Sequence, residues 1–199
     1  MKKYLAELIG TFLLTLSVLV SSGLITRIGT PALAALVVGF CVYTLGMISG
    51  AHFNPAITLA VFSVRKISVQ DTVGYIISQL VGAGLAAALA SLFLIMPINP
   101  LVKNASIVGL AELVGAFVLA FGVVAVIEKK VSQSLSGVVI GGALLIGISI
   151  ASTVSLGLIN PAVALAFGAR NVMYLLGPVV GAVIAMWLYR ALIGLKEEK

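Results

Sequence analysis

The tripeptide Asn-Pro-Ala occurs twice, at residues 54–56 and 160–162, in a chain that otherwise consists of long apolar runs. Six runs approach the length of about 20 residues that a helix needs to cross a bilayer; they lie near residues 4–25, 32–49, 72–95, 107–127, 135–156 and 172–194. Each Asn-Pro-Ala instead begins an apolar segment of about ten residues, at 54–64 and 160–169, which reaches only halfway across. Because 61% of the residues are hydrophobic and 9% are charged, we predict an all-α integral membrane protein with six transmembrane helices and two re-entrant half-helices.

The sequence repeats itself in a fixed order. The segment "AELIGTFLLT" at 6–15 matches "AELVGAFVLA" at 111–120, "NPAITLA" at 54–60 matches "NPAVALA" at 160–166, and "YIISQLVGAGLA" at 75–86 matches "YLLGPVVGAVIA" at 174–185. Each half contains three spans, and an odd number of spans inserts the second half upside down. We therefore predict one domain over residues 1–199, built from repeat 1 (1–98) and an inverted repeat 2 (106–199).

The basic residues predict the orientation in the membrane, since cytoplasmic loops carry an excess of Lys and Arg. A cytoplasmic N-terminus places most of them on that side, namely Lys2, Lys3, Arg65, Lys66, Lys129, Lys130, Arg190, Lys196 and Lys199, and leaves Arg27, Lys103 and Arg170 outside. We expect a multi-pass protein of the cell membrane with both termini in the cytoplasm. Basic residues placed between apolar spans do not indicate a nucleic-acid partner. Glu7, inside the first apolar run, argues against a cleaved signal peptide.

Each Asn-Pro pair is suited to begin a helix. Asn is a preferred N-cap, and Pro is favoured at the next position because no intrahelical donor is expected there. Inverted symmetry then brings the N-termini of the two half-helices together near the bilayer midplane, with Pro55 and Pro161 stacked. Because capping occupies each side-chain oxygen, the amide groups of Asn54 and Asn160 are expected to be free to donate into the gap. A water molecule between them would turn its oxygen toward both donors, which interrupts proton hopping.

With these features the sequence resembles the aquaporin, or major intrinsic protein, family. The resemblance covers nearly the whole chain and rests on the Ala-Glu-Leu openings at Ala6 and Ala111, on "SGAHFNPAIT", on the second "NPA" with its preceding glycine, Gly157, and on the small-residue "VGA" stretches. It implies a right-handed bundle of six tilted helices and two half-helices, usually a homotetramer with one pore per subunit. Asn54, Pro55, Ala56, Asn160, Pro161 and Ala162 would be the pore motifs of such a fold.

The sequence departs from the family at the expected outer constriction. Most members have Arg directly after the second Asn-Pro-Ala, where this chain has Val163, and family spacing places the other three constriction residues at Gly157, Ile148 and Ala34. None of these four side chains can form a hydrogen bond. We therefore expect an apolar constriction, wide at Ala34, that relies on backbone carbonyls and could favour dewetting.

Two acidic residues lie at equivalent positions inside spans, Glu7 and Glu112. A lone intramembrane acid can mark a proton-coupled transporter. The resemblance instead implies a supporting role, in which each glutamate accepts hydrogen bonds from the irregular backbone leading into a half-helix. His52 is likewise expected to brace the loop before Asn54.

Small residues recur at every fourth position of the third and sixth spans, at Gly74, Ser78, Gly82, Ala86 and Ala90 and at Gly177, Gly181 and Ala185. Such stripes predict close helix packing, because backbones can then approach one another within the membrane. Gln79, in the third span, is expected to satisfy internal polar groups.

These observations predict passive conduction of water or small uncharged solutes. A single cysteine, Cys41, and a single histidine provide no disulfide framework and no His-based metal site, and no catalytic arrangement is visible, so neither an enzyme nor a cofactor is expected. The alternatives are a secondary transporter, which also uses inverted repeats and broken helices, and a gas-permeable or non-conducting membrane protein.

Overall fold

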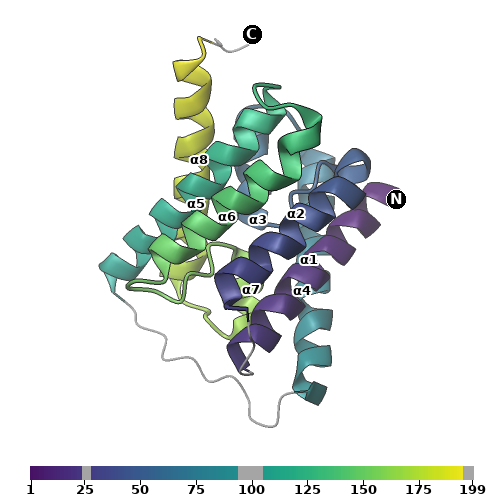
Figure 1. The fold of residues 1–199 in the computed structure, drawn as a ribbon, viewed down its shortest axis with the longest axis vertical. Helices are drawn as coiled ribbons and strands as arrows, with labels where there is room; N and C mark the ends of the chain where they lie inside the picture. The colour runs from purple at the N-terminus through teal and green to yellow at the C-terminus, as the bar shows by residue number, and fades with distance from the viewer. Residues whose placement is uncertain (24–27, 94–104, 195–199) are drawn as a thin grey trace.

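The computed structural model describes residues 1–23, 28–93 and 105–194. These residues form helices and no strands (Figure 1): α1 (Lys2–Gly23), α2 (Thr30–Ser49), α3 (Pro55–Ser63), α4 (Val69–Phe93), α5 (Ser106–Ile127), the 3-10 turn η1 (Gln133–Leu135), α6 (Ser136–Ala151), α7 (Pro161–Phe167) and α8 (Val172–Leu192). Six of them are long and apolar enough to span a membrane, and α3 and α7 are half-length. The predicted fold class is confirmed. Arg27, Lys103, Lys196 and Lys199 lie outside the described residues.

The fifth span is shorter than its apolar run predicted. The run continues to residue 156, whereas α6 ends at Ala151 and the chain passes through a turn at 152–155 into an irregular segment that leads to α7. Gly157 has a positive φ of 63° in this segment, and the backbone N–H groups of Leu158 and Ile159 donate to Glu112 rather than to a helix. Hydropathy does not separate residues 152–156 from the span, although Ser152, Thr153 and Val154 are exposed and the chain becomes buried only from Gly157 onward.

The stripes of small residues hold the two closest pairs of helices together. α1 packs against α4, and α5 packs against α8. A Cβ atom at Gly82 of α4 would collide with the carbonyl oxygen of Leu8, and one at Gly181 of α8 would collide with the carbonyl oxygen of Leu113. Leu8 and Leu113 each follow one of the two buried glutamates, so the two contacts are equivalent. The predicted close packing at these glycines is confirmed.

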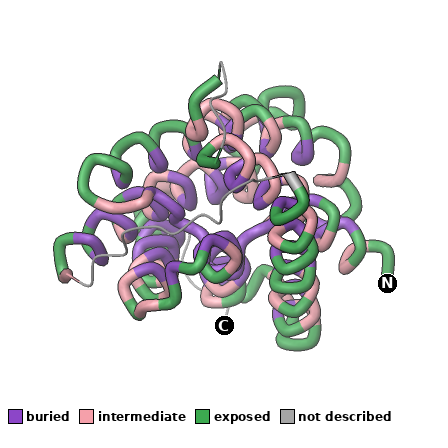
Figure 2. Tube along the Cα trace, turned by 90° about the horizontal axis from the view of Figure 1, so that it is seen from below, coloured by how far each residue is buried: buried purple, intermediate pink, exposed green. Residues whose placement is uncertain are grey.

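The two halves of the chain interlock through their half-helices. α3, from the first half, packs against α8, and α7, from the second half, packs against α4. The buried residues face the middle of the bundle and the exposed residues face outward (Figure 2). Many outward side chains are large and apolar, for example Leu36, Phe40 and Leu92, with exposed fractions of 60% or more. An apolar outer surface suits the lipid of a bilayer.

Candidate functional site

The two half-helices begin as their Asn-Pro pairs predicted. The Asn54 side-chain oxygen accepts a hydrogen bond from the Ala56 backbone N–H at 2.8 Å. The Asn160 oxygen accepts from the N–H groups of Ala162 at 3.0 Å and Val163 at 3.4 Å. Pro55 and Pro161 occupy the first helical positions. Both asparagines are almost fully buried, so each cap works in the interior of the bundle.

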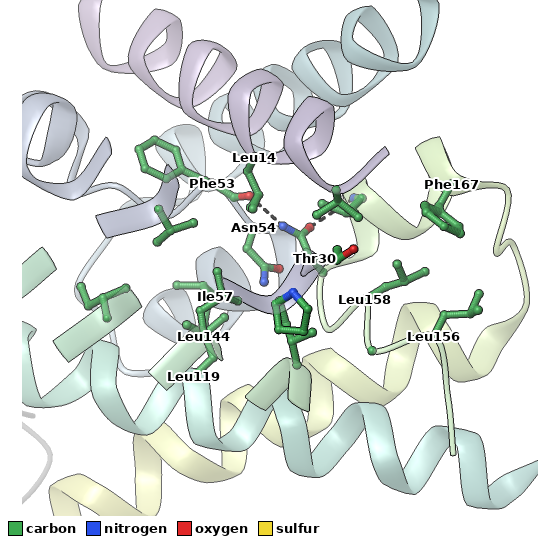
Figure 3. Close-up of a pocket in the computed structure, with 18 of the residues that line it drawn as sticks. Leu14, Thr30, Phe53, Asn54, Ile57, Leu119, Leu144, Leu156, Leu158 and Phe167 are labelled. Atoms are coloured by element: carbon green, nitrogen blue, oxygen red, sulfur yellow. Dashed lines mark hydrogen bonds between the residues drawn. The ribbon is translucent and has the colours of Figure 1, made fainter. Parts of the chain in front are cut away.

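The asparagine amides are less free than the sequence led us to expect. Asn54 Nδ2 donates to the Ile159 carbonyl oxygen at 3.0 Å. Asn160 Nδ2 donates to the Phe53 carbonyl oxygen at 2.9 Å, a hydrogen bond drawn as a dashed line at Phe53 in Figure 3. Each amide therefore bonds across to the residue preceding the other asparagine. Phe53 and Ile159 have φ values of 49° and 40°. Their buried carbonyl groups do not accept a hydrogen bond within a helix, so each needs a donor from elsewhere. The side-chain amides of Asn54 and Asn160 each have two N–H groups, and the hydrogen bonds among the described residues use one of the two.

Glu7 and Glu112 hold the backbone that leads into each half-helix. Glu7 accepts hydrogen bonds from the backbone N–H groups of His52 at 3.0 Å and Phe53 at 2.7 Å. Glu112 accepts from the N–H groups of Leu158 at 3.1 Å and Ile159 at 2.6 Å. Both side chains have an exposed fraction of 0%. These are the backbone contacts that we expected for the two glutamates.

Hydroxyl and amide groups complete the partners of the glutamates. Ser49 Oγ and Gln79 Nε2 donate to Glu7 at 2.7 and 2.8 Å, and Ser155 Oγ donates to Glu112 at 2.8 Å. Gln79 Nε2 also donates to Thr58 Oγ1 at 2.9 Å, which links α4 to α3. The repeat contains Pro178 where the first half has Gln79, so Glu112 lacks this fourth donor.

His52 both braces the loop and faces the interior space. Its Nδ1 lies 3.1 Å from Thr58 Oγ1, and its ring meets the Tyr75 ring edge-on with 5.2 Å between centroids. Tyr75 in turn donates from its hydroxyl group to the Ser49 carbonyl at 2.6 Å. The histidine is thus fixed against α3 and α4 while part of it lines the central cavity described next.

A cavity of about 290 Å³ lies between the half-helices and the long helices that surround them (Figure 3). Both Asn54 and Asn160 line it. Most of the wall is apolar, and much of it consists of equivalent residues from the two halves of the chain: Leu14 with Leu119, Val18 with Val123, and Ile57 with Val163. The four residues from α1 and α5 were not predicted from the sequence, because an apolar side chain that faces a cavity looks the same in sequence as one that faces lipid.

The structure brings three of the four expected constriction residues to this cavity. Ile148, Gly157 and Val163 line it, together with the hydroxyl-bearing residues Ser22, Thr30 and Ser152. Ala34 does not line it: its methyl group is fully buried in α2, and Pro31 and Val38, about one turn away on either side, form the wall there. A side chain of one carbon is too short to reach past its neighbours. Arg170, the first cation after Val163, is exposed beyond the end of α7 and does not line the cavity either.

The described residues form six membrane-spanning helices that surround two half-helices, and the two half-helices meet end to end. This arrangement defines a class of membrane channel, and known proteins of similar sequence belong to that class. The major intrinsic protein family model matches residues 1–189, and the chain belongs to this family. Its members are membrane channels for water or small solutes and not enzymes. The predicted family is confirmed.

Individual proteins match the chain along nearly its whole length. "Glycerol uptake facilitator protein-like 6" of Lactiplantibacillus plantarum is 31% identical over 96% of this chain and 98% of its own length. "Aquaporin AqpM" of Methanothermobacter thermautotrophicus is 29% identical over 96% of this chain and 97% of its own. The X-ray structure of the aquaglyceroporin from Plasmodium falciparum superposes with a TM-score of 0.73 at 19% identity, covering 97% of this chain and 96% of that one, which supports the fold.

Proposed function

We propose that the chain is a passive channel whose pore is the central cavity, with Asn54 and Asn160 facing the permeating molecule. The observation that carries the proposal is that both asparagines and equivalent residues of both halves line one cavity. In this proposal residues 1–199 form a single channel domain of two inverted repeats, 1–98 and 106–199. The second N–H group of each asparagine amide donates to a passing molecule.

The state of the two buried glutamates supports a channel over a secondary transporter. A transporter needs a group that binds or releases a coupling ion. Glu7 already accepts four hydrogen bonds and Glu112 three, and neither is exposed. Protonating either carboxylate would weaken these hydrogen bonds, and displacing it would leave buried backbone N–H groups without a partner, which costs about 1–3 kcal/mol for each group. The side chains that bond across between the two half-helices are the neutral amides of Asn54 and Asn160.

We propose that the constriction discriminates weakly among small neutral solutes. Ile148, Gly157 and Val163 offer no hydrogen-bonding side chain, with Val38 and Pro31 forming the wall beside the buried Ala34. A site that must be hydrogen-bonded rejects a molecule that leaves it unpaired, and an apolar wall has no such means of selection. Water and polyols of the size of glycerol, which the name of one relative mentions, fit this class of permeant.

We further propose a homotetramer in the cell membrane with both termini in the cytoplasm. The orientation follows from the basic residues, and the assembly follows from the family resemblance. Lys2, Lys3, Arg65, Lys66, Lys129 and Lys130 all lie at helix ends or in turns, where cations remain in contact with water.

Flux into proteoliposomes tests conduction against coupled transport. We expect glycerol flux to rise linearly with the gradient, without saturation at modest concentration and without dependence on a pH or Na⁺ gradient. Protein-free liposomes of the same lipid are the control. Uphill uptake driven by either ion gradient would contradict the proposal, and permeability equal to that of the protein-free liposomes for water, glycerol and urea would favour a gas-permeable or non-conducting protein.

A further inference from the structure

Helices α3 and α5 end in the same unusual turn. Two residues after the last residue of each helix lies a basic residue with a positive φ, Arg65 at 59° after α3 and Lys129 at 55° after α5. In each case the next residue closes the turn, with Lys66 N donating to the Val61 carbonyl at 3.1 Å and Lys130 N donating to the Ala125 carbonyl at 2.9 Å. This left-handed position favours glycine, since a Cβ atom is strained there.

Two other helices of the chain are followed by a glycine in the left-handed conformation. Gly50 follows α2 with a φ of 88°, and Gly168 follows α7 with a φ of 91°. The left-handed residue after α2 and after α7 is glycine, so a cation is not required there to close a helix in this fold. The left-handed conformation is strained for a residue other than glycine, so its presence at two basic residues indicates that their charges have a function.

Ion pairs of Glu128, whose side chain is largely buried, connect the two turns at one end of the bundle. Glu128, the last residue before Lys129, lies with its Oε2 3.7 Å from Lys66 Nζ and its Oε1 3.2 Å from Arg190 Nε. Arg190 Nη1 also donates to the Val64 carbonyl at 3.2 Å, at the end of α3. The turn between α5 and α6 and the last turn of α8 lie at the same end of the molecule in Figure 1.

Three cations of these turns have no acidic partner among the described residues. Arg65, Lys129 and Lys130 are exposed, and the ion pairs that the structure describes involve only Lys3 with Asp71 and Glu128 with Lys66 and Arg190. Exposed apolar side chains follow each turn, Val69 at the start of α4 and Leu135 in η1, with exposed fractions of 65% and 53%. Each turn therefore has exposed cations that are followed along the chain by an exposed apolar side chain.

We propose that Arg65, Lys66, Lys129 and Lys130, which we call the basic turn cluster, bind the phosphate of an anionic lipid headgroup. Cations clustered at the ends of membrane spans attract anionic lipids. A lipid fits better than free phosphate, because Val69 and Leu135 can contact its acyl chains while the cations contact its headgroup. Glu128 keeps the two turns together so that cations from both face one headgroup.

Native mass spectrometry of the purified protein with added phosphatidylglycerol or phosphatidylcholine tests the site. The informative variants are Arg65→Gly and Lys129→Gly, because glycine suits the left-handed backbone and should leave the melting temperature unchanged or raised. We expect each to weaken phosphatidylglycerol binding by about fivefold, the factor that corresponds to about 1 kcal/mol for one cation near a membrane surface. The double variant should lose about 25-fold, and Arg65→Lys should retain native binding.

The control removes a single exposed cation elsewhere, by Arg170→Gln beyond α7. Unchanged phosphatidylglycerol binding in this variant supports the assignment to the basic turn cluster. An equal loss in Arg170→Gln, or native affinity in the double glycine variant, would overturn it. Competition by inorganic phosphate at the same concentration as the lipid would also overturn it, since the site would then recognise a free anion.

Discussion

Replacing Gly82 by Ala should loosen the packing of α1 on α4 and disturb the site through it. A Cβ atom at Gly82 would collide with the Leu8 carbonyl oxygen and would lie 3.2 Å from both the Leu8 carbonyl carbon and the Phe12 nitrogen. All three atoms belong to the backbone of α1, so α1 must move as a whole. Overpacking of this kind costs about 1–3 kcal/mol.

Gly84, in the same helix, provides a matched control. A Cβ atom there would meet nothing within 4 Å. Both substitutions gain the same helix propensity, about 0.5–1 kcal/mol relative to glycine, so this gain cancels between them. Gly82→Ala should therefore be about 1–3 kcal/mol less stable than Gly84→Ala. Titration with SDS in mixed micelles, followed by circular dichroism, measures the difference.

The same pair of variants connects packing to conduction. Leu8 is adjacent to Glu7, whose carboxylate holds the backbone N–H groups of His52 and Phe53 before the first half-helix. Movement of α1 should displace this carboxylate and lower the water permeability of proteoliposomes severalfold in Gly82→Ala, while Gly84→Ala stays native. Equal stability of the two variants would refute the packing argument. Native permeability in a destabilised Gly82→Ala would refute its link to the pore.

Two further predictions concern the polar groups of the site. Asn54→Asp and Asn160→Asp keep an N-cap oxygen but remove the donor to the opposite carbonyl. We therefore expect each to change the permeability or its selectivity severalfold in stopped-flow assays. Asn171→Asp, at the N-cap of α8 outside the cavity, should behave as native in the same assays. Similar effects in all three would remove the two asparagines from the pore. Glu112→Ala leaves two buried backbone N–H groups unpaired and should cost about 2–6 kcal/mol in SDS titration, and Glu112→Gln, which keeps one acceptor oxygen, should cost about half as much. Equal losses would contradict the proposed role of the carboxylate.

Much of the fold was predictable because two independent signals agree. The length of each apolar run separates spans from half-spans, and the repeat of Glu7 at Glu112 and of Asn54 at Asn160 assigns equivalent roles to both halves. The N-caps followed from the residues themselves, since Asn followed by Pro can start a helix whatever surrounds it.

The sequence could not predict features that depend on the tertiary environment. Hydropathy extended the fifth span past Ala151, because it measures composition and does not show where an apolar stretch stops being helical. The hydrogen bonds between the asparagine amides and the opposite carbonyls depend on positive φ values at Phe53 and Ile159, bulky residues that adopt them only under constraint. Family spacing placed Ala34 at the constriction. Its side chain is short and the rotation of α2 turns it into the protein, so Ala34 lies behind the residues that line the cavity.

The relative permeabilities of native protein and Val163→Arg to water, glycerol and urea test most directly whether the cavity is a weakly selective pore for neutral molecules. Val163 lines the cavity beside Asn160, so an arginine there would add hydrogen-bond donors and positive charge to an apolar wall. Stopped-flow light scattering of vesicles should show that the native protein passes water and both solutes, and that Val163→Arg sharply reduces glycerol and urea flux while sparing water. A native protein that passes water but excludes glycerol and urea would contradict the account, because its backbone groups would then select without help from side chains.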